Sequence, residues 1–180
     1  MDNNKELNVF ETENLTTEQA LAEVEKDFGF VPNLLGELAK SPAAPLVYTK
    51  SDLLMHNAHL TQQEQQVVQL VVSLYNGCQY CSSMHSKFSE VNGAEHDDIL
   101  AIRKGEYPKD KHLGNLMWIT ETILEKRGHL TTKDLEIIED MGIDRGRLYE
   151  IIVHIGRKMI ANYAVHIINP ELDEVFVFEE

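Results

Sequence analysis

The most informative segment of this sequence for fold and chemistry is Cys78-Gln79-Tyr80-Cys81-Ser82-Ser83-Met84-His85. It holds both cysteines of the chain at positions i and i+3, and a histidine follows the second cysteine at i+4. Residues at these spacings lie on one face of a helix. If the segment is helical, two sulfurs and one imidazole share a single stripe, which suits thiol redox chemistry.

The residues on either side of this stretch carry helix signals. Asn76-Gly77 offers the left-handed residues that a helix end prefers, so we expect the preceding helix to end near Tyr75 and a new helix to run to Val91. Three segments also share one helix start, in which a leucine precedes a threonine and an acid or amide follows three residues after the threonine. This pattern predicts a capping box in each of Leu15-Thr16-Thr17-Glu18-Gln19, Leu60-Thr61-Gln62-Gln63-Glu64 and Leu130-Thr131-Thr132-Lys133-Asp134.

The rest of the chain is also predicted to be helical. Helices are expected over 94–104, 112–126, 131–141 and 144–168, and 34–60 is mostly helical. The last helix is apolar nearly all round, which predicts burial in the core or against another subunit. The one strand-like run is Val175-Phe176-Val177-Phe178, which could pack on a neighbour or have no role. Because strands and helices do not alternate, the predicted class is all-α rather than a thioredoxin-type sheet.

The predicted organisation is one helical bundle with two loosely related halves. A flexible N-terminal segment covers 1–14, a single helical domain covers 15–168 with the redox motif at 76–91, and an acidic tail covers 169–180. The acidic clusters at 95–98 and 171–174 are expected to be solvated, and the first favours a helix N-terminus.

Composition limits the possible partners. The 180 residues carry 43% hydrophobic and 26% charged residues, as in a globular domain, and a net charge of −14. This charge repels phosphate backbones, so neither nucleic acid nor an anionic membrane surface is an expected partner. No apolar run is long enough to span a bilayer, and the polar N-terminus lacks the core of a signal peptide. We therefore expect a cytoplasmic protein, where a close cysteine pair is more often catalytic or metal-binding than structural.

The position of the cysteine pair favours thiol activation. Cys78 falls at a helix N-terminus, where free amides stabilise a thiolate, and His85 can take the proton of a thiol or hold the thiolate by its charge. One sulfur could attack a peroxide and its neighbour could resolve the sulfenic acid as a disulfide. Two alternatives remain: a zinc site, which needs a fourth ligand from elsewhere, and simple packing. Neither a metal nor a cofactor is predicted.

These residues resemble a known family. Asn76-Gly77-Cys78-Gln79-Tyr80-Cys81 with His85, after a helix starting Leu60-Thr61, is similar to the alkyl hydroperoxidase D-like, peroxidase-related branch of the carboxymuconolactone decarboxylase superfamily. Weaker likenesses lie at Phe28-Gly29-Phe30-Val31-Pro32-Asn33, Ser41-Pro42-Ala43, Asn162-Tyr163 with His166, and Leu172-Asp173. The resemblance implies an all-helical fold, assembly as trimers or hexamers, and an antioxidant dithiol activity. It also implies that Cys81 attacks the peroxide, and that Cys78 resolves the product and exchanges with a partner's disulfide.

Two positions depart from the family pattern. The glutamate of the family's proton relay corresponds to Gln66, whose amide cannot accept a proton but can orient a water or the His85 imidazole. Glu64 is no substitute, because it lies nearly on the opposite face and is expected to serve the capping box of Thr61. A histidine that often precedes the second cysteine is Tyr80 here, which is no base near neutral pH. We therefore expect a depleted relay, with slow turnover or an unusual substrate.

Three functions follow from these observations. The first is a peroxidase that takes electrons from a dithiol or disulfide-exchange protein partner, works as a homo-oligomer and uses Cys78, Cys81 and His85. The second is a lyase of the decarboxylase type, and the third is a non-catalytic oligomer that senses redox state. His154 and His166 are expected to be core or interface residues, and His56 and His59 surface or linker residues.

Overall fold

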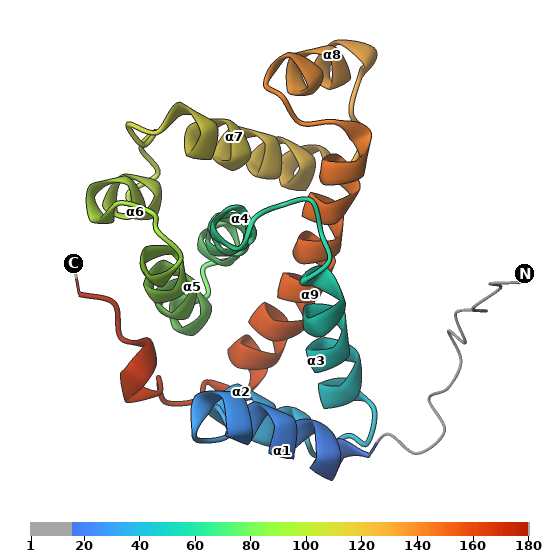
Figure 1. Ribbon diagram of the computed structural model, residues 1–180, viewed down its shortest axis with the longest axis vertical. Coiled ribbons are helices and arrows are strands. Elements are labelled where there is room, and N and C mark those ends of the chain that lie inside the picture. The colour runs from blue at the N-terminus through green and yellow to red at the C-terminus, as the bar shows by residue number, and fades with distance from the viewer. Residues whose placement is uncertain (1–15, 180) are drawn as a thin grey trace, which may run out of the picture.

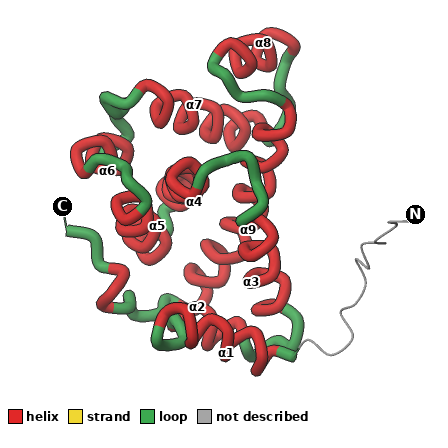
Figure 2. Tube along the Cα trace, in the orientation of Figure 1, coloured by secondary structure: helices red, strands yellow, loops and turns green. Residues whose placement is uncertain are grey.

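A computed structural model describes residues 16–179 of the chain, so the predicted segment 1–14 lies outside the described residues. The described part is built of helices, with no strand among them (Figures 1 and 2). The elements are α1 (Thr17–Phe28), α2 (Asn33–Leu38), α3 (Ala44–Met55), α4 (Gln62–Tyr75), α5 (Gln79–Val91), α6 (His96–Arg103), α7 (Lys111–Lys126), α8 (Thr132–Asp140), α9 (Arg145–Ile168) and the 3₁₀ turn η1 (Glu174–Phe176). The all-α prediction is confirmed, with helix ends within about two residues of those expected.

Local sequence explains the helix starts. Thr16, Thr61 and Thr131 each close the predicted capping box. The end of α4 differs in one detail, because Asn76 stays right-handed and Gly77 alone takes the left-handed conformation, with φ of 69°. A residue with a side chain would be strained there, so glycine permits the turn that leads into α5.

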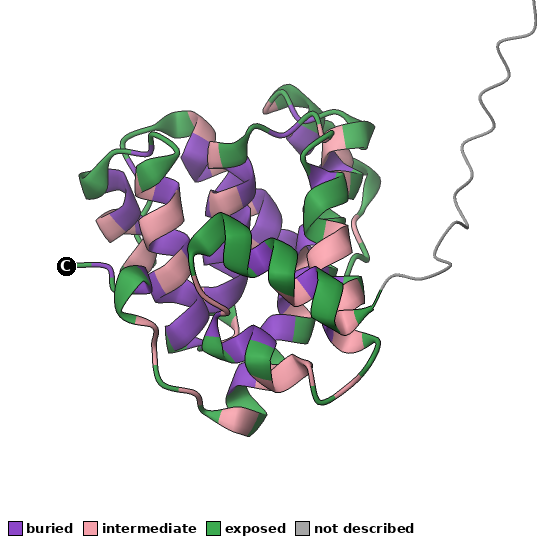
Figure 3. Ribbon diagram, turned by 60° about the horizontal axis from the view of Figure 1, so that its bottom comes forward, coloured by how far each residue is buried: buried purple, intermediate pink, exposed green. Residues whose placement is uncertain are grey.

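The core surrounds α4, which packs against α5, α7 and α9 (Figure 1). One buried cluster fills the space between α4, α6, α7 and the first half of α9. A second cluster lies between α1, α2, α5 and the end of α9, and it contains both cysteines. In Figure 3 the outer faces of the helices are exposed, while buried residues line the interior. None of the helices in residues 16–179 is long and apolar enough to cross a membrane.

The predictions for the last helix and for the strand-like run have different outcomes. Within the described chain α9 is buried along one side, and its other side would be covered only by another subunit, which is the second of the two predicted alternatives. The exposed apolar side chains on that side are Tyr149, Ile152, Val153, Ile160, Tyr163 and Ile167. The run 175–178 is no strand, since it forms the end of η1 and an extended segment. Its aromatic side chains, Phe176 and Phe178, are buried within the chain itself. Aromatic side chains stand at every second position here because two of them hold the tail against the rest of the chain, and not because the segment is a strand.

The tail docks on α5 through one serine and one aromatic ring. The Ser83 hydroxyl donates to the Phe176 carbonyl oxygen at 2.8 Å and accepts from the Phe178 amide at 3.0 Å. The Phe176 ring lies 5.6–6.5 Å, centroid to centroid, from four other rings: Phe28, Phe30, Tyr80 and Phe88. The tail is therefore part of the cysteine-side cluster.

Replacing Phe176 by alanine is expected to lower the free energy of unfolding by about 3 kcal/mol, because it empties a ring-sized space at a site 2% exposed. Chemical denaturation measures this. Val175→Ala is the control, since Val175 is exposed next to it and should change stability by less than about 0.5 kcal/mol. Equal effects of the two substitutions would show that the tail does not dock.

Glu64 joins three helices as well as closing its capping box. Its carboxylate, 3% exposed, accepts from the Thr61 amide at 2.5 Å, His112 Nε2 at 2.6 Å and Arg147 Nη1 at 3.2 Å. Burial acts to raise the pKa of Glu64, but the bonds from Thr61 and His112 outweigh it and lower the pKa. Charge on Glu64 therefore stabilises the fold.

Glu64→Ala is expected to cost about 2 kcal/mol of unfolding free energy at neutral pH. Because the folded pKa lies below the unfolded value of about 4.3, this contribution is complete above that value and disappears as the pH falls through the folded pKa. Denaturation at several pH values tests this, with exposed Glu136→Ala as the control. A difference between wild type and Glu64→Ala that persists in strong acid would contradict it.

Candidate active site

The two thiols lie at the start of α5. Cys78 is the N-cap residue and Cys81 lies in the first turn, and both are buried, with 1% and 0% of their surface exposed. The turn at Gly77 and a bond from the Cys78 amide to the Ser73 carbonyl oxygen at 2.9 Å hold the first cysteine over the helix end. The prediction that Cys78 lies at a helix N-terminus is confirmed.

The two sulfurs have opposite protonation tendencies. A hydrogen bond with Cys81, burial and the charge on Cys81 all raise the pKa of Cys78. The hydrogen bond from Cys78 lowers the pKa of Cys81 to about 6, helped by the charge of Lys158 and by hydrogen bonds from Asn162 and Lys158, against the effect of burial. Cys81 is therefore the thiolate at neutral pH, and Cys78 is the thiol that donates to it.

Lys158 is the buried cation of the site. It projects from α9 with no exposed surface, and its Nζ lies 2.7 Å from His85 Nε2 and 3.4 Å from the Tyr48 hydroxyl. Burial acts to lower the pKa of Lys158, but Tyr48 and the charge of Cys81 raise it above its ordinary value. The ammonium and the Cys81 thiolate thus form a buried ion pair.

His85 links Lys158 to α4. An ammonium can only donate, so His85 Nε2 accepts from Lys158 and the ring proton lies on Nδ1, which donates to Gln66 Oε1 at 2.8 Å. Burial, followed by the charge of Lys158, holds the pKa of His85 well below its usual range, so the imidazole is neutral. Gln66 orients the imidazole, as its amide was expected to be able to do. With both nitrogens engaged, the imidazole has none left for a thiol proton.

Tyr80 lies outside this chain of contacts and secures the tail. Its hydroxyl donates to Asp173 Oδ2, and the Asn33 amide donates to the same carboxylate at 3.3 Å. Burial, then the Asp173 contact, raises the pKa of Tyr80. Asp173 is therefore a partner of Tyr80, which corrects the expectation that 171–174 is only solvated. Asp98 corrects the same expectation for 95–98, because it is buried and accepts from the Lys109 amide at 2.6 Å.

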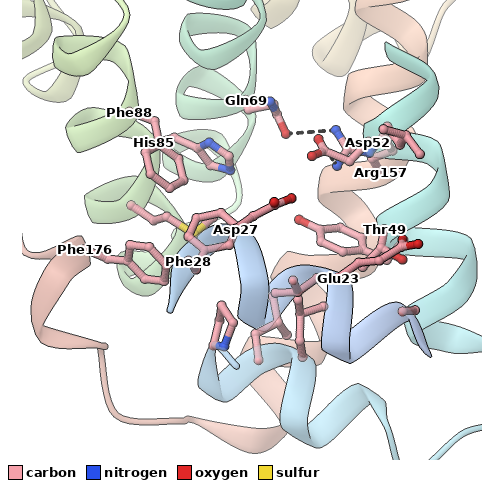
Figure 4. A pocket seen from close by; sticks show the side chains of 18 of the residues that line it. Glu23, Asp27, Phe28, Thr49, Asp52, Gln69, His85, Phe88, Arg157 and Phe176 are labelled. Atoms are coloured by element: carbon pink, nitrogen blue, oxygen red, sulfur yellow. Dashed lines mark hydrogen bonds and ion pairs between the residues drawn. The ribbon is translucent and has the colours of Figure 1, made fainter. Parts of the chain in front are cut away.

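A cavity of about 190 Å³ opens beside the site, between α1, α3, α4 and α5 (Figure 4). His85, Gln66, Tyr48 and Tyr80 form its inner wall, so it ends at side chains next to Lys158 and Cys81. Apolar and aromatic groups cover much of the remaining wall: Val24, Phe28, Leu34, Leu35, Met84, Phe88 and Phe176. Neither sulfur reaches the wall itself, so a substrate must displace a side chain to meet Cys81.

Arg157 forms the wall of the cavity on the α9 side. Its guanidinium bonds Asp52 at 2.6 Å and Gln69 Oε1 at 3.2 Å, and lies 5.2 Å from the centroid of the Tyr48 ring (Figure 4). Asp52 is half exposed at the mouth. Arg157 therefore fixes Tyr48, which in turn contacts Lys158.

The other histidines lie apart from the thiols. His154 is buried in α9, next to Arg157, and burial lowers its pKa to about 4. His166 is exposed and does not join Asn162, whose amide oxygen instead accepts from Asn76 Nδ2 at 2.9 Å. His56 and His59 are exposed, as expected. Within residues 16–179, no group of three or more histidine, cysteine, aspartate or glutamate side chains is placed to hold a metal ion.

Sequence reasoning missed Lys158, Arg157 and Tyr48. A signal was present, because Arg157-Lys158 stands in the middle of the apolar run of α9, where a basic residue has few ways to remain solvated.

The fold and site define a helical dithiol protein with a buried thiolate. Residues 43–108 match the model of the carboxymuconolactone decarboxylase family. That match and the shared fold described below agree with the resemblance to the alkyl hydroperoxidase D-like branch of the carboxymuconolactone decarboxylase superfamily.

Several solved structures share the fold. An alkylhydroperoxidase AhpD core, an uncharacterized peroxidase-related protein from Ralstonia eutropha JMP134, is 18% identical with a TM-score of 0.80, covering 89% of this chain and 86% of the other. A peroxidase-related protein from Silicibacter sp. TM1040 is 17% identical, with a TM-score of 0.77 and the same coverage. The debrominase Bmp8 in complex with 2,3,4-tribromopyrrole is 14% identical, with a TM-score of 0.72, covering 88% and 86%. No protein with curated annotation matches the chain.

Proposed function

We propose that this protein reduces hydroperoxides with its cysteine pair and takes the electrons from a dithiol partner. The observation that carries the proposal is the buried ion pair, which keeps Cys81 a thiolate while the Cys78 thiol points at it. Thiolate is the species that attacks a peroxide oxygen, and a neighbouring thiol is what a sulfenic acid needs for its resolution. His85, Lys158 and Gln66 support the reaction by fixing the charge beside Cys81.

The chemistry has three steps. The Cys81 thiolate attacks the outer oxygen of the hydroperoxide, the O–O bond breaks, and Cys81 becomes a sulfenic acid while an alkoxide leaves and takes up one proton to become the alcohol. The Cys78 sulfur then attacks the Cys81 sulfur, and water leaves as the disulfide forms. A dithiol restores both thiols and is itself oxidised to a disulfide.

The proposal also includes a protein partner, a homo-oligomeric state and a reducing compartment. Both thiols are buried, so exchange with a protein partner requires local opening around Cys78. The exposed apolar side of α9 supports assembly as a homo-oligomer, because large apolar patches on monomers are uncommon. The dithiol supply implies a reducing compartment such as the cytoplasm.

The test is a single-turnover reaction of the reduced wild-type protein. One equivalent of cumene hydroperoxide should be consumed per chain, two thiols should disappear, and cumyl alcohol should form; added dithiothreitol should then restore the thiols and sustain turnover. Disulfide formation without sustained turnover would favour a redox sensor. Thiols that survive excess peroxide in the folded protein would refute the proposal and leave the lyase function.

A second candidate is reductive dehalogenation of a small aromatic compound. The aromatic wall of the cavity, with rings from Phe28, Phe88 and Phe176, favours a flat apolar ligand, and a structure similar to this fold is that of a debrominase. Incubation of the reduced protein with 2,3,4-tribromopyrrole and measurement of released bromide tests it. Absence of bromide at protein concentrations that consume peroxide would exclude this candidate.

A further inference from the structure

We infer that Lys158 is a third catalytic residue, which lends a proton to the oxygen that leaves when Cys81 breaks the O–O bond and regains it from Cys81 on reduction. The inference rests on the proposed peroxidase function and assigns a proton source within it. The need is chemical, since an alkoxide is a strong base and leaves slowly unless it is protonated in the transition state.

Lys158 has the geometry of such a donor. The charge of Lys158 and a side-chain hydrogen bond from it both lower the pKa of Cys81, so the ammonium stands near the atom to which the peroxide oxygen becomes bonded. Its other contacts, His85 Nε2 and the Tyr48 hydroxyl, belong to the inner wall of the cavity. A peroxide that reaches Cys81 from the cavity must therefore pass next to the ammonium.

Three alternative donors, on His85, Tyr80 and Cys78, are occupied. His85 carries its single ring proton on Nδ1, pointing at Gln66 Oε1, so its Nε2 faces the site as an acceptor. The Tyr80 proton is directed at Asp173, and the Cys78 proton is needed for the water that leaves in the second step. Gln66 and His85 are positioning residues on this account, because they aim an acceptor at Lys158 and so fix where its protons point.

Charge and proton balances agree with this role. A protonated Lys158 and a Cys81 thiolate neutralise each other before the reaction. When the thiolate becomes a sulfenic acid and the ammonium gives its proton to RO⁻, both charges vanish together and ROH leaves. Resolution releases water without net proton transfer. On reduction by the dithiol, Cys81 returns as a thiol and passes its proton to the lysine amine, which restores the ion pair. The sum is ROOH plus dithiol giving ROH, water and disulfide.

The burial of Lys158 requires such a balance. Its side chain has no exposed surface, and the basic residues Arg157, His154 and His85 lie near it. An ammonium left in this place after the thiolate has gone would be an uncompensated buried charge, which is costly. Loss of the proton at the moment the thiolate is consumed avoids that state.

The variant Lys158→Arg distinguishes the role of Lys158 as a proton donor from the effect of its positive charge on Cys81. Arginine keeps a positive charge beside Cys81 but does not release a proton near neutral pH. In single turnover, Lys158→Arg should react with cumene hydroperoxide about 10²-fold more slowly than wild type. Its reaction with perbenzoic acid should change little, because a carboxylate leaves without help. The ratio of the two rates is measured within one sample, so it does not depend on how much of the variant is folded.

The possible results separate the two proposals. Wild type inert to both peroxides would refute the peroxidase function itself. An active wild type with equal slowing of both peroxides in Lys158→Arg, or with no slowing of either, would overturn the acid role while leaving the peroxidase function intact. A preferential loss of the hydroperoxide reaction supports the acid role.

A second measurement uses wild type alone and covers the case in which Lys158→Arg does not fold. One equivalent of cumene hydroperoxide is added to the reduced protein in weakly buffered solution at a pH where ultraviolet absorbance shows the thiolate, and proton uptake is recorded. No net uptake per disulfide is expected, because the proton comes from Lys158. Uptake of one proton per disulfide would show that Lys158 keeps its charge, and would overturn the inference.

Discussion

Replacing Cys81 by serine is expected to abolish hydroperoxide consumption, whereas Cys78→Ser should still consume one equivalent and then stop. The asymmetry follows from the protonation of the pair, in which Cys81 is the thiolate and Cys78 is the thiol that donates to it. A serine at position 78 can donate the same hydrogen bond, so Cys81 keeps its nucleophile. Without a second sulfur the sulfenic acid cannot be resolved.

The measurement is a single-turnover assay with a sulfenic acid trap such as dimedone, followed by mass spectrometry. Cys78→Ser should carry one trapped adduct at Cys81, and wild type should carry none because the disulfide forms first. Cys78→Ala is the matched control, since it also lacks the hydrogen bond and should react more slowly than Cys78→Ser. A reactive Cys81→Ser protein with an inert Cys78→Ser protein would show that the roles of the two sulfurs are reversed.

Replacing Lys158 by methionine is expected to return the pKa of Cys81 from about 6 toward the ordinary value for a thiol. The hydrogen bond from Cys78 remains, so the thiolate fraction at pH 7 should fall by up to about 30-fold, the limit set by an ordinary thiol pKa of about 8.5. Loss of the proton donor should slow the reaction with an alkyl hydroperoxide by about a further 10²-fold. Methionine matches the length of the lysine stem and leaves no unpaired charge in the core.

First-turnover rates across pH measure this effect. The rate of Lys158→Met should keep rising up to alkaline pH, while that of wild type should level off above about pH 6, the pKa of Cys81. Lys87→Met is the control, because Lys87 lies on the same helix as Cys81, half exposed and paired with Glu90. Circular dichroism reports whether each variant is folded. Identical pH profiles for wild type and a folded Lys158→Met would remove Lys158 from the mechanism.

The parts of the fold that could be predicted are those set by local sequence. The boxes at Thr16, Thr61 and Thr131 depend on residues three apart, and the turn at Gly77 depends on one residue, so they are visible in the sequence. The placement of Cys78 at a helix start followed from that turn. These predictions needed no knowledge of tertiary contacts.

The parts that could not be predicted depend on contacts between distant residues. Lys158 and His85 are 73 positions apart in the sequence and meet because α9 packs against α5. The sequence alone therefore suggested that His85 acts directly on a thiol, whereas in the structure its imidazole contacts Lys158. The docking of 175–178 depends on Ser83, which is 93 positions from Phe176. Periodicity could not show that one side of α9 is exposed, because both of its sides are apolar.

The most direct test of the central claim is a pH titration of the reduced protein followed by thiolate ultraviolet absorbance. We predict that one thiolate forms with a midpoint near pH 6, the pKa of Cys81, that Cys78→Ser keeps this transition, and that Cys81→Ser loses it. Below the midpoint the thiolate should be protonated, so absorbance and peroxide reactivity should fall together. Two thiols titrating near the ordinary value of about 8.5, or a low transition that survives in Cys81→Ser, would contradict the account.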